Sequence, residues 1–203
     1  MLRAIIGVNL AVFALMVGVT GTFSWSARTL LYWGGNFGEL TLSGQPWRLL
    51  TAQYLHANLI HIFGNMLLLF YAGRYVESLV GPARFVLCYS AAGIAAGLLS
   101  AWAHPDVVGV GASGAIAGVI GMLIAFHYTG RAPEVSGAWV WQTVALNALL
   151  SLAPGVDWVA HIGGLLTGIG CAVLLFASVP SARARLPRPP AAESRDEGGP
   201  TLP

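Results

Sequence analysis

Long apolar runs separated by short polar connections dominate the chain. Crossing the hydrocarbon core of a bilayer takes about 20 apolar residues, with a range of roughly 17 to 25. Measured against that length, the pattern predicts an all-α membrane protein with six membrane-spanning helices. These spans are expected near residues 4–19, 59–79, 84–102, 113–128, 137–152 and 158–177.

Three of the six runs need comment. The runs 113–128 and 137–152 are short for full spans, and short helices are tolerated where their ends line a wet cavity enclosed by protein. The first run, preceded by Arg3, is similar to a secretory signal peptide. Because no cleavage site of the A-x-A kind follows it, we interpret it as an uncleaved span.

The two longest polar segments differ in character. Residues 22–58 form the longest connection and are rich in aromatic residues, which predicts a structure lying partly in the outer leaflet. Residues 179–203 contain six prolines and charges of both signs, which predicts a disordered cytoplasmic tail. The expected organisation is therefore a six-helix membrane domain over 1–178 and a tail over 179–203.

Composition supports a membrane protein. Hydrophobic residues make up 56% of the chain and charged residues 9%, and mean hydropathy is +0.71. A soluble domain carries about 25% charged residues. These values exclude a soluble enzyme, a nucleic-acid binder and a disordered tether. The net charge of +2 indicates no polyanionic partner. Cys88 and Cys171 lie in apolar runs without metal-ligand spacing and are expected to be buried hydrophobes.

The arginines orient the predicted spans. With six spans and a cytoplasmic N-terminus, eight of the ten arginines fall on the cytoplasmic side. The other two, Arg28 and Arg48, lie in the first connection, outside. Cytoplasmic loops carry an excess of basic residues. We therefore expect a multi-pass protein, with both termini cytoplasmic, in a prokaryotic plasma membrane.

Polar residues of the spans lie at one depth. His56, His61 and Asn65 mark the outer start of the second span, Ser113 opens the fourth from outside, and His161 lies one turn into the sixth. Polar groups inside a membrane are costly, so each is a candidate functional residue. Three helices would thus contribute polar groups to one place in the outer half of the membrane.

Helical geometry refines this cluster. His61 and Asn65, at i and i+4, share a helix face. Small residues form stripes on two other spans and allow close approach of membrane helices, so we expect the fourth and sixth spans to pack together and bring Ser113 against His161. The stripes are Gly114, Ala117, Gly118 and Gly121 on the fourth span, and Gly164 and Gly168 beside His161 on the sixth.

These residue types favour acyl transfer to water. A serine hydroxyl needs a neighbouring base to become nucleophilic, and imidazole suits that task near neutral pH. The start of a helix attracts developing negative charge, and His61 and Asn65 can add side-chain donors. Asp157 is either a third member orienting His161 or the N-cap of the sixth span, and we favour the cap.

Other interpretations remain open. A serine in a membrane helix often bonds its own i−4 carbonyl, and a single intramembrane histidine often only packs. A catalytically silent protein that binds membrane helices is the main alternative, and a small transporter or a haem or metal protein is a weaker one. His104 and His127 are expected to lie outside the cluster.

The motifs together resemble the rhomboid family of intramembrane serine proteases. The resemblance covers roughly residues 33–177, with its motifs in the family's order. They are Trp47-Arg48, then His56, His61 and Asn65, then Glu77 with Gly81, then Gly111-Ala112-Ser113-Gly114, and finally Ala160-His161-Ile162-Gly163-Gly164 with Gly168.

The resemblance implies a six-helix core, no metal or cofactor, and single-span membrane proteins as substrates, cut near their outer ends within lipid. It implies that Ser113 is the nucleophile and His161 the general base. Further implied roles are the oxyanion hole (His61, Asn65 and the Ser113 N–H), site support (His56, Gly111, Gly114) and structural residues (Trp47, Arg48, Glu77, Gly164, Gly168). Many relatives have an aromatic residue four positions after the serine, where this chain has Ala117.

Overall fold

The computed structural model describes residues 1–151 and 157–179, and helices occupy all six predicted apolar runs. Residue 152, at the end of the fifth run, lies outside the described residues. The six long helices are α1 (Leu2–Thr20), α5 (Leu59–Val80), α6 (Pro82–Ala103), α7 (Ser113–Tyr128), α8 (Gly137–Ser151) and α9 (Trp158–Leu175), and the 3₁₀ helix η2 (Phe176–Ser178) follows α9.

Four helices within the described ranges are long and apolar enough to cross a membrane. They are α1, α5, α6 and the combined α9–η2 segment. Helix α7, with 16 residues, and α8, with 15 residues, are shorter. This difference in length agrees with the expectation that the fourth and fifth runs are short for full spans.

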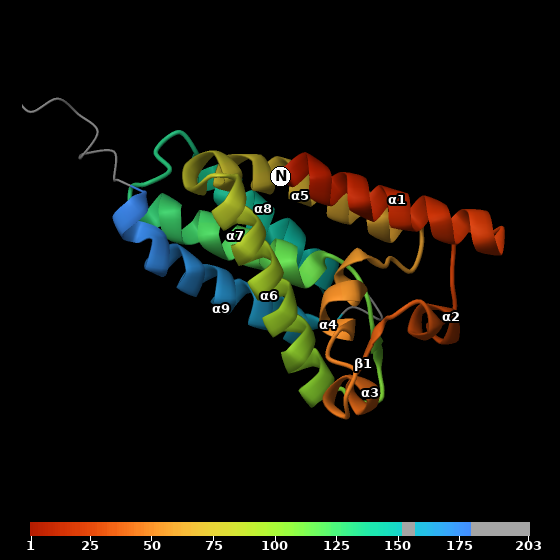
Figure 1. The fold of residues 1–203 in the computed structure, drawn as a ribbon. Helices are drawn as coiled ribbons and strands as arrows, with labels where there is room; N and C mark the ends of the chain where they lie inside the picture. The colour runs from red at the N-terminus through yellow and green to blue at the C-terminus, as the bar shows by residue number, and fades with distance from the viewer. Residues whose placement is uncertain (152–156, 180–203) are drawn as a thin grey trace, which may run out of the picture.

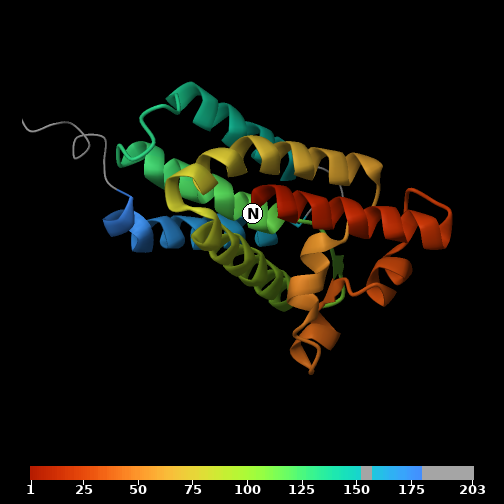
Figure 2. The same cartoon turned by 45° about the horizontal axis from the view of Figure 1, so that its top comes forward.

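Helix α7 forms the centre of the bundle. It packs against α5, α6, α8 and α9, and Figures 1 and 2 show it running through the middle of these four helices. Every residue from Gly114 to Leu123 is buried. A helix that is apolar on all sides is expected where protein surrounds it completely.

Helices α7 and α9 touch backbone to backbone. A Cβ atom added at Gly164 would overlap the carbonyl oxygen of Gly114, and one at Gly168 would overlap that of Gly118. Only glycine allows this approach, since any side chain would occupy the space of the neighbouring carbonyl. The predicted glycine-mediated packing of the fourth and sixth spans is confirmed.

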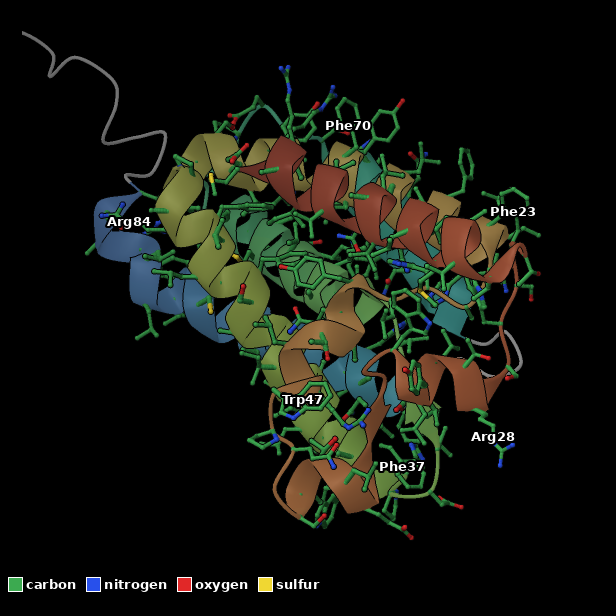
Figure 3. The ribbon with its side chains drawn as sticks, turned by 45° about the vertical axis from the view of Figure 1, so that its right-hand side comes forward. Phe23, Arg28, Phe37, Trp47, Phe70 and Arg84 are labelled. Atoms are coloured by element: carbon green, nitrogen blue, oxygen red, sulfur yellow. The ribbon has the colours of Figure 1, made fainter. Side chains whose placement is uncertain are left out.

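The first connection is a folded lobe at one end of the bundle, on which Figure 3 labels Phe37 and Trp47. Strand β1 pairs antiparallel with β2, which lies in the connection that leads to α7. The lobe is thereby joined to the segment before Ser113. Its elements are α2 (Ala27–Tyr32), β1 (Asn36–Phe37), α3 (Gly38–Leu42), α4 (Arg48–Thr51) and the 3₁₀ helix η1 (Ala52–Tyr54), and its partner strand is β2 (Val108–Gly109).

Arg48 holds the lobe together from inside. Its guanidinium donates to the carbonyls of Leu31 (2.8 Å) and Gly35 (2.9 Å) and to Gln45 Oε1 (2.7 Å), and it lies 4.6 Å from the ring centroid of Trp47. The Arg48 side chain is buried, so these hydrogen bonds replace the water that the charge has lost. Such contacts fit the structural role expected for Trp47 and Arg48.

The lobe rests on α6 at positions where α6 has glycine. Asn36 Nδ2 donates to the Gly97 carbonyl (2.8 Å), and the amide of Gln53 fills the space that a side chain at Gly93 would need. At the other end of the bundle, Glu77 Oε1 accepts from the Leu2 N–H (2.9 Å), which links α1 to α5. These contacts fix the lobe and α1 on the helical core.

The folded domain extends to Val179, the last residue that the structure describes. Val179, which we expected to be the first residue of the tail, is buried, and its N–H donates to the Leu175 carbonyl (3.1 Å). The rest of the predicted tail, 180–203, lies outside the described residues. Of the two cysteines, Cys88 is buried as expected and Cys171 is half-buried.

Candidate active site

A turn at Gly111 precedes Ser113 at the start of α7. Gly111 has a φ of +120°, a conformation that favours glycine, and its N–H donates to the Ala52 carbonyl (2.9 Å). A Cβ atom at Gly111 would lie 2.8 Å from Nε2 of His61 and 3.5 Å from Nδ2 of Asn65. The turn before the serine is therefore in direct contact with two predicted oxyanion-hole residues.

Ser113 is half-buried and is the first residue of α7. The N-cap residue is Ala112, which has no side-chain oxygen to cap the helix. The first backbone N–H groups of α7 are thus not occupied by an N-cap side chain, and they carry the positive end of the helix dipole. An oxygen with developing negative charge beside Ser113 would be stabilised there.

His161 is buried in the first turn of α9, next to the closest approach of α7. The carbonyl of its neighbour Ala160 lies 3.7 Å from the position of a Cβ atom at Gly114. Gly114 directly follows Ser113. The first turns of the two helices therefore lie side by side, one beginning with the serine and the other containing the histidine.

The start of α5 brings two histidines together. Asn58 caps the helix, because its Oδ1 accepts from the His61 N–H (2.9 Å). The rings of His56 and His61 meet edge to face, with centroids 5.0 Å apart. His61 Nδ1 accepts from the Ala57 N–H (3.4 Å), so in the neutral ring the proton is on Nε2, which faces Gly111.

His56 lies just before α5 and is almost completely buried, with 1% of its surface exposed. Burial, and secondly the charge of His61, lower the pKa of His56 to about 3. The ring is therefore neutral at physiological pH. A neutral imidazole in this place packs against His61 without adding a charge to the site.

Asn65 supplies a donor that has no partner in the described part of the chain. It is buried on α5, yet its Nδ2 makes no hydrogen bond there. Buried polar groups normally have a partner in protein, water or ligand. An amide donor in contact with the Gly111 turn is thus available to a bound group.

Asp157 is the N-cap of α9, as we favoured from the sequence. Its Oδ1 accepts from the N–H groups of Val159 (3.0 Å) and Ala160 (3.1 Å). The same oxygen lies 3.4 Å from Nδ1 of His104. The expectation for His104 was thus incomplete, because this loop residue contacts the helix that carries His161. Sequence reasoning missed the contact, since the two residues are far apart in the chain.

His127 lies at the opposite end of α7, as expected. Its Nε2 is 3.3 Å from the position of a Cβ atom at Gly137, at the start of α8. Within residues 1–151 and 157–179, no group of three His, Cys, Asp or Glu side chains is arranged to hold a metal ion.

A shallow apolar groove runs between α5 and α8. The two helices that form it are the second and fifth predicted spans. The residues that line it are Leu67, Leu68 and Tyr71 from α5 and Trp139, Gln142, Thr143 and Leu146 from α8.

Comparison with known proteins gives one consistent result. Residues 43–178 match the Rhomboid domain family. The chain is 36% identical over 142 residues to RHOMBOID-like protein 6, mitochondrial, of Arabidopsis thaliana, covering 68% of this chain and 46% of that protein. It is 34% identical over 155 residues to Rhomboid protease GluP of Bacillus subtilis (strain 168), covering 75% of this chain and 30% of that protein.

One relative is named as inactive. Inactive RHOMBOID-like protein 8 of Arabidopsis thaliana is 31% identical over 147 residues, covering 70% of this chain and 42% of that protein. The chain spans less than half the length of each of these three relatives. Because the family match runs from the first-connection lobe to the end of η2, this membrane-embedded helical chain belongs to the rhomboid family, which is generally one of intramembrane serine proteases.

Proposed function

We propose that the chain is an intramembrane serine endopeptidase that hydrolyses peptide bonds in or next to transmembrane segments, with Ser113 and His161 as a catalytic dyad. One observation carries the proposal, namely the close approach of the first turns of α7 and α9, where the Cβ position of Gly114 lies 3.7 Å from the Ala160 carbonyl. Ser113 directly precedes Gly114 and His161 directly follows Ala160, so this approach supports a pairing of the serine with the histidine.

The chemistry follows from the two residue types. Ser113 Oγ attacks the carbonyl carbon of the scissile bond while His161 takes the hydroxyl proton and passes it to the leaving amine. Water then attacks the acyl-enzyme, with His161 again acting as base. The water comes from a cavity walled by protein below the outer surface, where polar groups are tolerated inside a membrane.

The oxyanion is stabilised by donors from two elements. The Ser113 N–H, His61 Nε2–H and Asn65 Nδ2–H are the candidate donors. The hydrogen bond from Ala57 to His61 Nδ1 supports this role, because it keeps the proton of the neutral ring on the nitrogen that faces Gly111. The unpartnered amide of Asn65 supports it independently.

The remaining predicted residues support the site without reacting. His56 packs against His61, Gly111 forms the turn before the serine, and Gly114 permits the close approach of Ala96 on α6. The structural residues shape the fold around the site. They are Trp47 and Arg48 in the lobe, Glu77 between α5 and α1, and Gly164 and Gly168 on α9.

Substrates are single-span membrane proteins, and they reach the site between α5 and α8. The apolar groove between these helices supports this route, since a transmembrane segment leaving lipid needs an apolar surface. The substrate helix must unwind before its carbonyl is exposed, so the site should prefer Gly, Pro, Ser or Ala near the cut. Both termini of the chain are cytoplasmic in a prokaryotic plasma membrane, and cleavage occurs near the outer ends of substrates.

A catalytically silent membrane-helix-binding protein is the second candidate, since one relative bears the name inactive. A serine-reactive fluorophosphonate probe separates the two functions. Labelling of the wild type that disappears in Ser113→Ala supports the protease, and a wild type without any labelling supports the silent protein.

The main test uses a panel of tagged single-span proteins reconstituted with the wild type or with Ser113→Ala. We expect fragments whose masses place the cut near the outer end of the segment, formed by the wild type only. Equal fragmentation by both proteins, or none by either, would overturn the proposal.

A further inference from the structure

A histidine and an aspartate join two elements of the candidate site at its outer edge. His104 is the C-cap of α6, and Asp157 is the N-cap of α9. His104 Nδ1 lies 3.4 Å from Asp157 Oδ1, and both side chains are partly exposed. His104 begins the connection that leads to Ser113, Asp157 directly precedes the helix that carries His161, and neither belongs to the proposed dyad.

Two backbone hydrogen bonds hold His104 in place. Its N–H donates to the Ser100 carbonyl (2.8 Å), and its carbonyl accepts from Val107 (3.1 Å). The following Pro105 packs on the lobe so closely that a Cβ atom at Gly38 would lie 2.5 Å from its Cα. His104 thus opens the connection that continues through β2 to Ser113.

Asp157 is bound to the turn that carries His161. Its Oδ1 caps the N–H groups of Val159 and Ala160, and its own carbonyl accepts from the His161 N–H (3.3 Å). A displacement of Asp157 therefore displaces the first turn of α9. The pair formed by His104 and Asp157 couples that turn to the connection before α7.

The pair of His104 and Asp157 adds a side-chain contact to the glycine contacts of α7 and α9. The backbone contacts of Gly164 with Gly114 and of Gly168 with Gly118 fix how the two helices pack, and the pair lies beyond them, at the N-terminal end of α9. Proton transfer requires Ser113 and His161 to stay within hydrogen-bond reach. A contact of His104 with Asp157 adds a restraint on the turn that carries His161.

We infer that His104 is a positioning residue, which holds Asp157 and so aligns His161 with Ser113. The inference rests on the proposed function. Misplacement by about 1 Å can lower turnover roughly 10²-fold, and loss of one of several restraints should have a smaller effect. The role is distinct from that of a third catalytic residue, because His104 acts only through Asp157.

The test compares His104→Asn, which keeps an N–H donor as many bonds from Cα as Nδ1, with His104→Leu, which has none. We expect His104→Leu to lower kcat about 10-fold with KM unchanged, and His104→Asn to remain within about 3-fold of the wild type. His127→Leu, at the other end of α7, is the matched control and should keep the wild-type kcat.

A second pair of variants shows whether the effect runs through Asp157. Asp157→Ser keeps an N-cap but is too short to reach His104, so His104→Leu should lower kcat less than about 2-fold in that background. The same cycle is measured on thermal unfolding in Ser113→Ala protein, which reports the contact without activity. Absence of Ser113-dependent cleavage in the wild type would refute the proposed function alone, while the unfolding cycle would still test the pair.

Three results would overturn the inference. They are a wild-type kcat in His104→Leu, an equal loss in His104→Asn and His104→Leu, and an undiminished effect of His104→Leu in the Asp157→Ser background. If His104→Leu fails to fold, His104→Asn and Asp157→Ser still decide the matter, because the inference predicts that the first stays active and that the second loses turnover.

Discussion

The histidines of this chain lie in different surroundings. His161 lies in the first turn of α9 beside the start of α7, and His61 faces the Gly111 turn. His56 is buried behind His61, His104 meets Asp157 at the rim, and His127 lies at the far end of α7. Substitution of each should therefore have a different outcome, and activity measurements can assign the roles one by one.

Removal of either member of the dyad should nearly abolish cleavage. Ser113→Ala and His161→Ala should each lower kcat about 10⁴-fold, and the double variant should be little worse, because the two residues act as one unit. Single-turnover cleavage of a tagged substrate measures this. His127→Ala is the control and should retain near-normal activity. Similar activities in all of these variants would show that the dyad is wrongly assigned.

His56 should make the folded protein sensitive to acid. Its pKa is about 3 in the folded state and about 6.5 when unfolded, so between these values the unfolded chain binds the extra proton. Stability from the neutral ring is complete above about pH 6.5 and falls by up to about 1.4 kcal/mol per pH unit below it.

Unfolding of the wild type and of His56→Gln in detergent at pH 7.5 and 4.5 checks this. The wild type should lose more free energy of unfolding on acidification than the variant does. An identical pH dependence in both proteins would mean that His56 is not held neutral by burial.

Gly111 should not tolerate a side chain. Alanine would combine an unfavourable positive φ with a Cβ atom 2.8 Å from the His61 ring, and strain of this kind costs about 1–3 kcal/mol. We expect Gly111→Ala to lower kcat by roughly 10²-fold, since the turn carries Ser113. Gly44→Ala is the control, because Gly44 also has a positive φ but no neighbour within 4 Å, and it should leave kcat unchanged.

Among whole elements, the packing of α7 on α9 has the strictest geometry. Alanine at Gly168 would overlap the carbonyl of Gly118, whereas Gly170 on the same helix has nothing within 4 Å. Gly168→Ala should lower stability by about 1–3 kcal/mol, and Gly170→Ala should be neutral or slightly stabilising. Denaturation in mixed micelles measures both, and equal effects at the two positions would contradict the observed packing.

The helices could be predicted from the sequence because the patterns that indicate them are local. Apolar runs of sufficient length predicted the ranges of α5, α6 and α9 closely, and the small-residue stripes predicted the α7–α9 contact. The interior of the first connection was not accessible, because its short helices depend on distant anchors such as Asn36 on Gly97 and Gln53 on Gly93.

The candidate site, too, could be predicted from the sequence only in part. Residue types and depth indicated Ser113, His161, His61 and Asn65, because polar residues are rare enough in membrane spans to stand out. The contact of His104 with Asp157 left no such signal, since it depends on how a loop folds back over the bundle. Polar residues in loops have no comparable energetic cost. They therefore do not stand out in the sequence as candidate functional residues.

For the molecule as a whole, the groove between α5 and α8 is the proposed entry route of a transmembrane substrate. Tyr75 of α5 contacts Trp139 of α8, one of the residues that line the groove, with ring centroids 5.1 Å apart. Linking these positions should hinder a transmembrane substrate and leave the reactivity of Ser113 intact.

The test uses Tyr75→Cys with Trp139→Cys and a bifunctional maleimide, in a chain whose Cys88 and Cys171 are replaced by alanine. We expect cleavage of a membrane substrate to fall at least about 10-fold after linking, and fluorophosphonate labelling to continue. Each single cysteine treated with the same reagent is the control. Full cleavage by the linked protein would exclude this route.

The order of the helices along the chain has a consequence for synthesis. The hydroxyl is carried by α7 and the imidazole by α9, and α9 leaves the ribosome later. A nascent or truncated chain that ends before residue 158 therefore holds the proposed nucleophile without its proposed base. Proteolytic competence would arise only when the last long helix docks, so half-made copies would be harmless to the proteins inserted beside them.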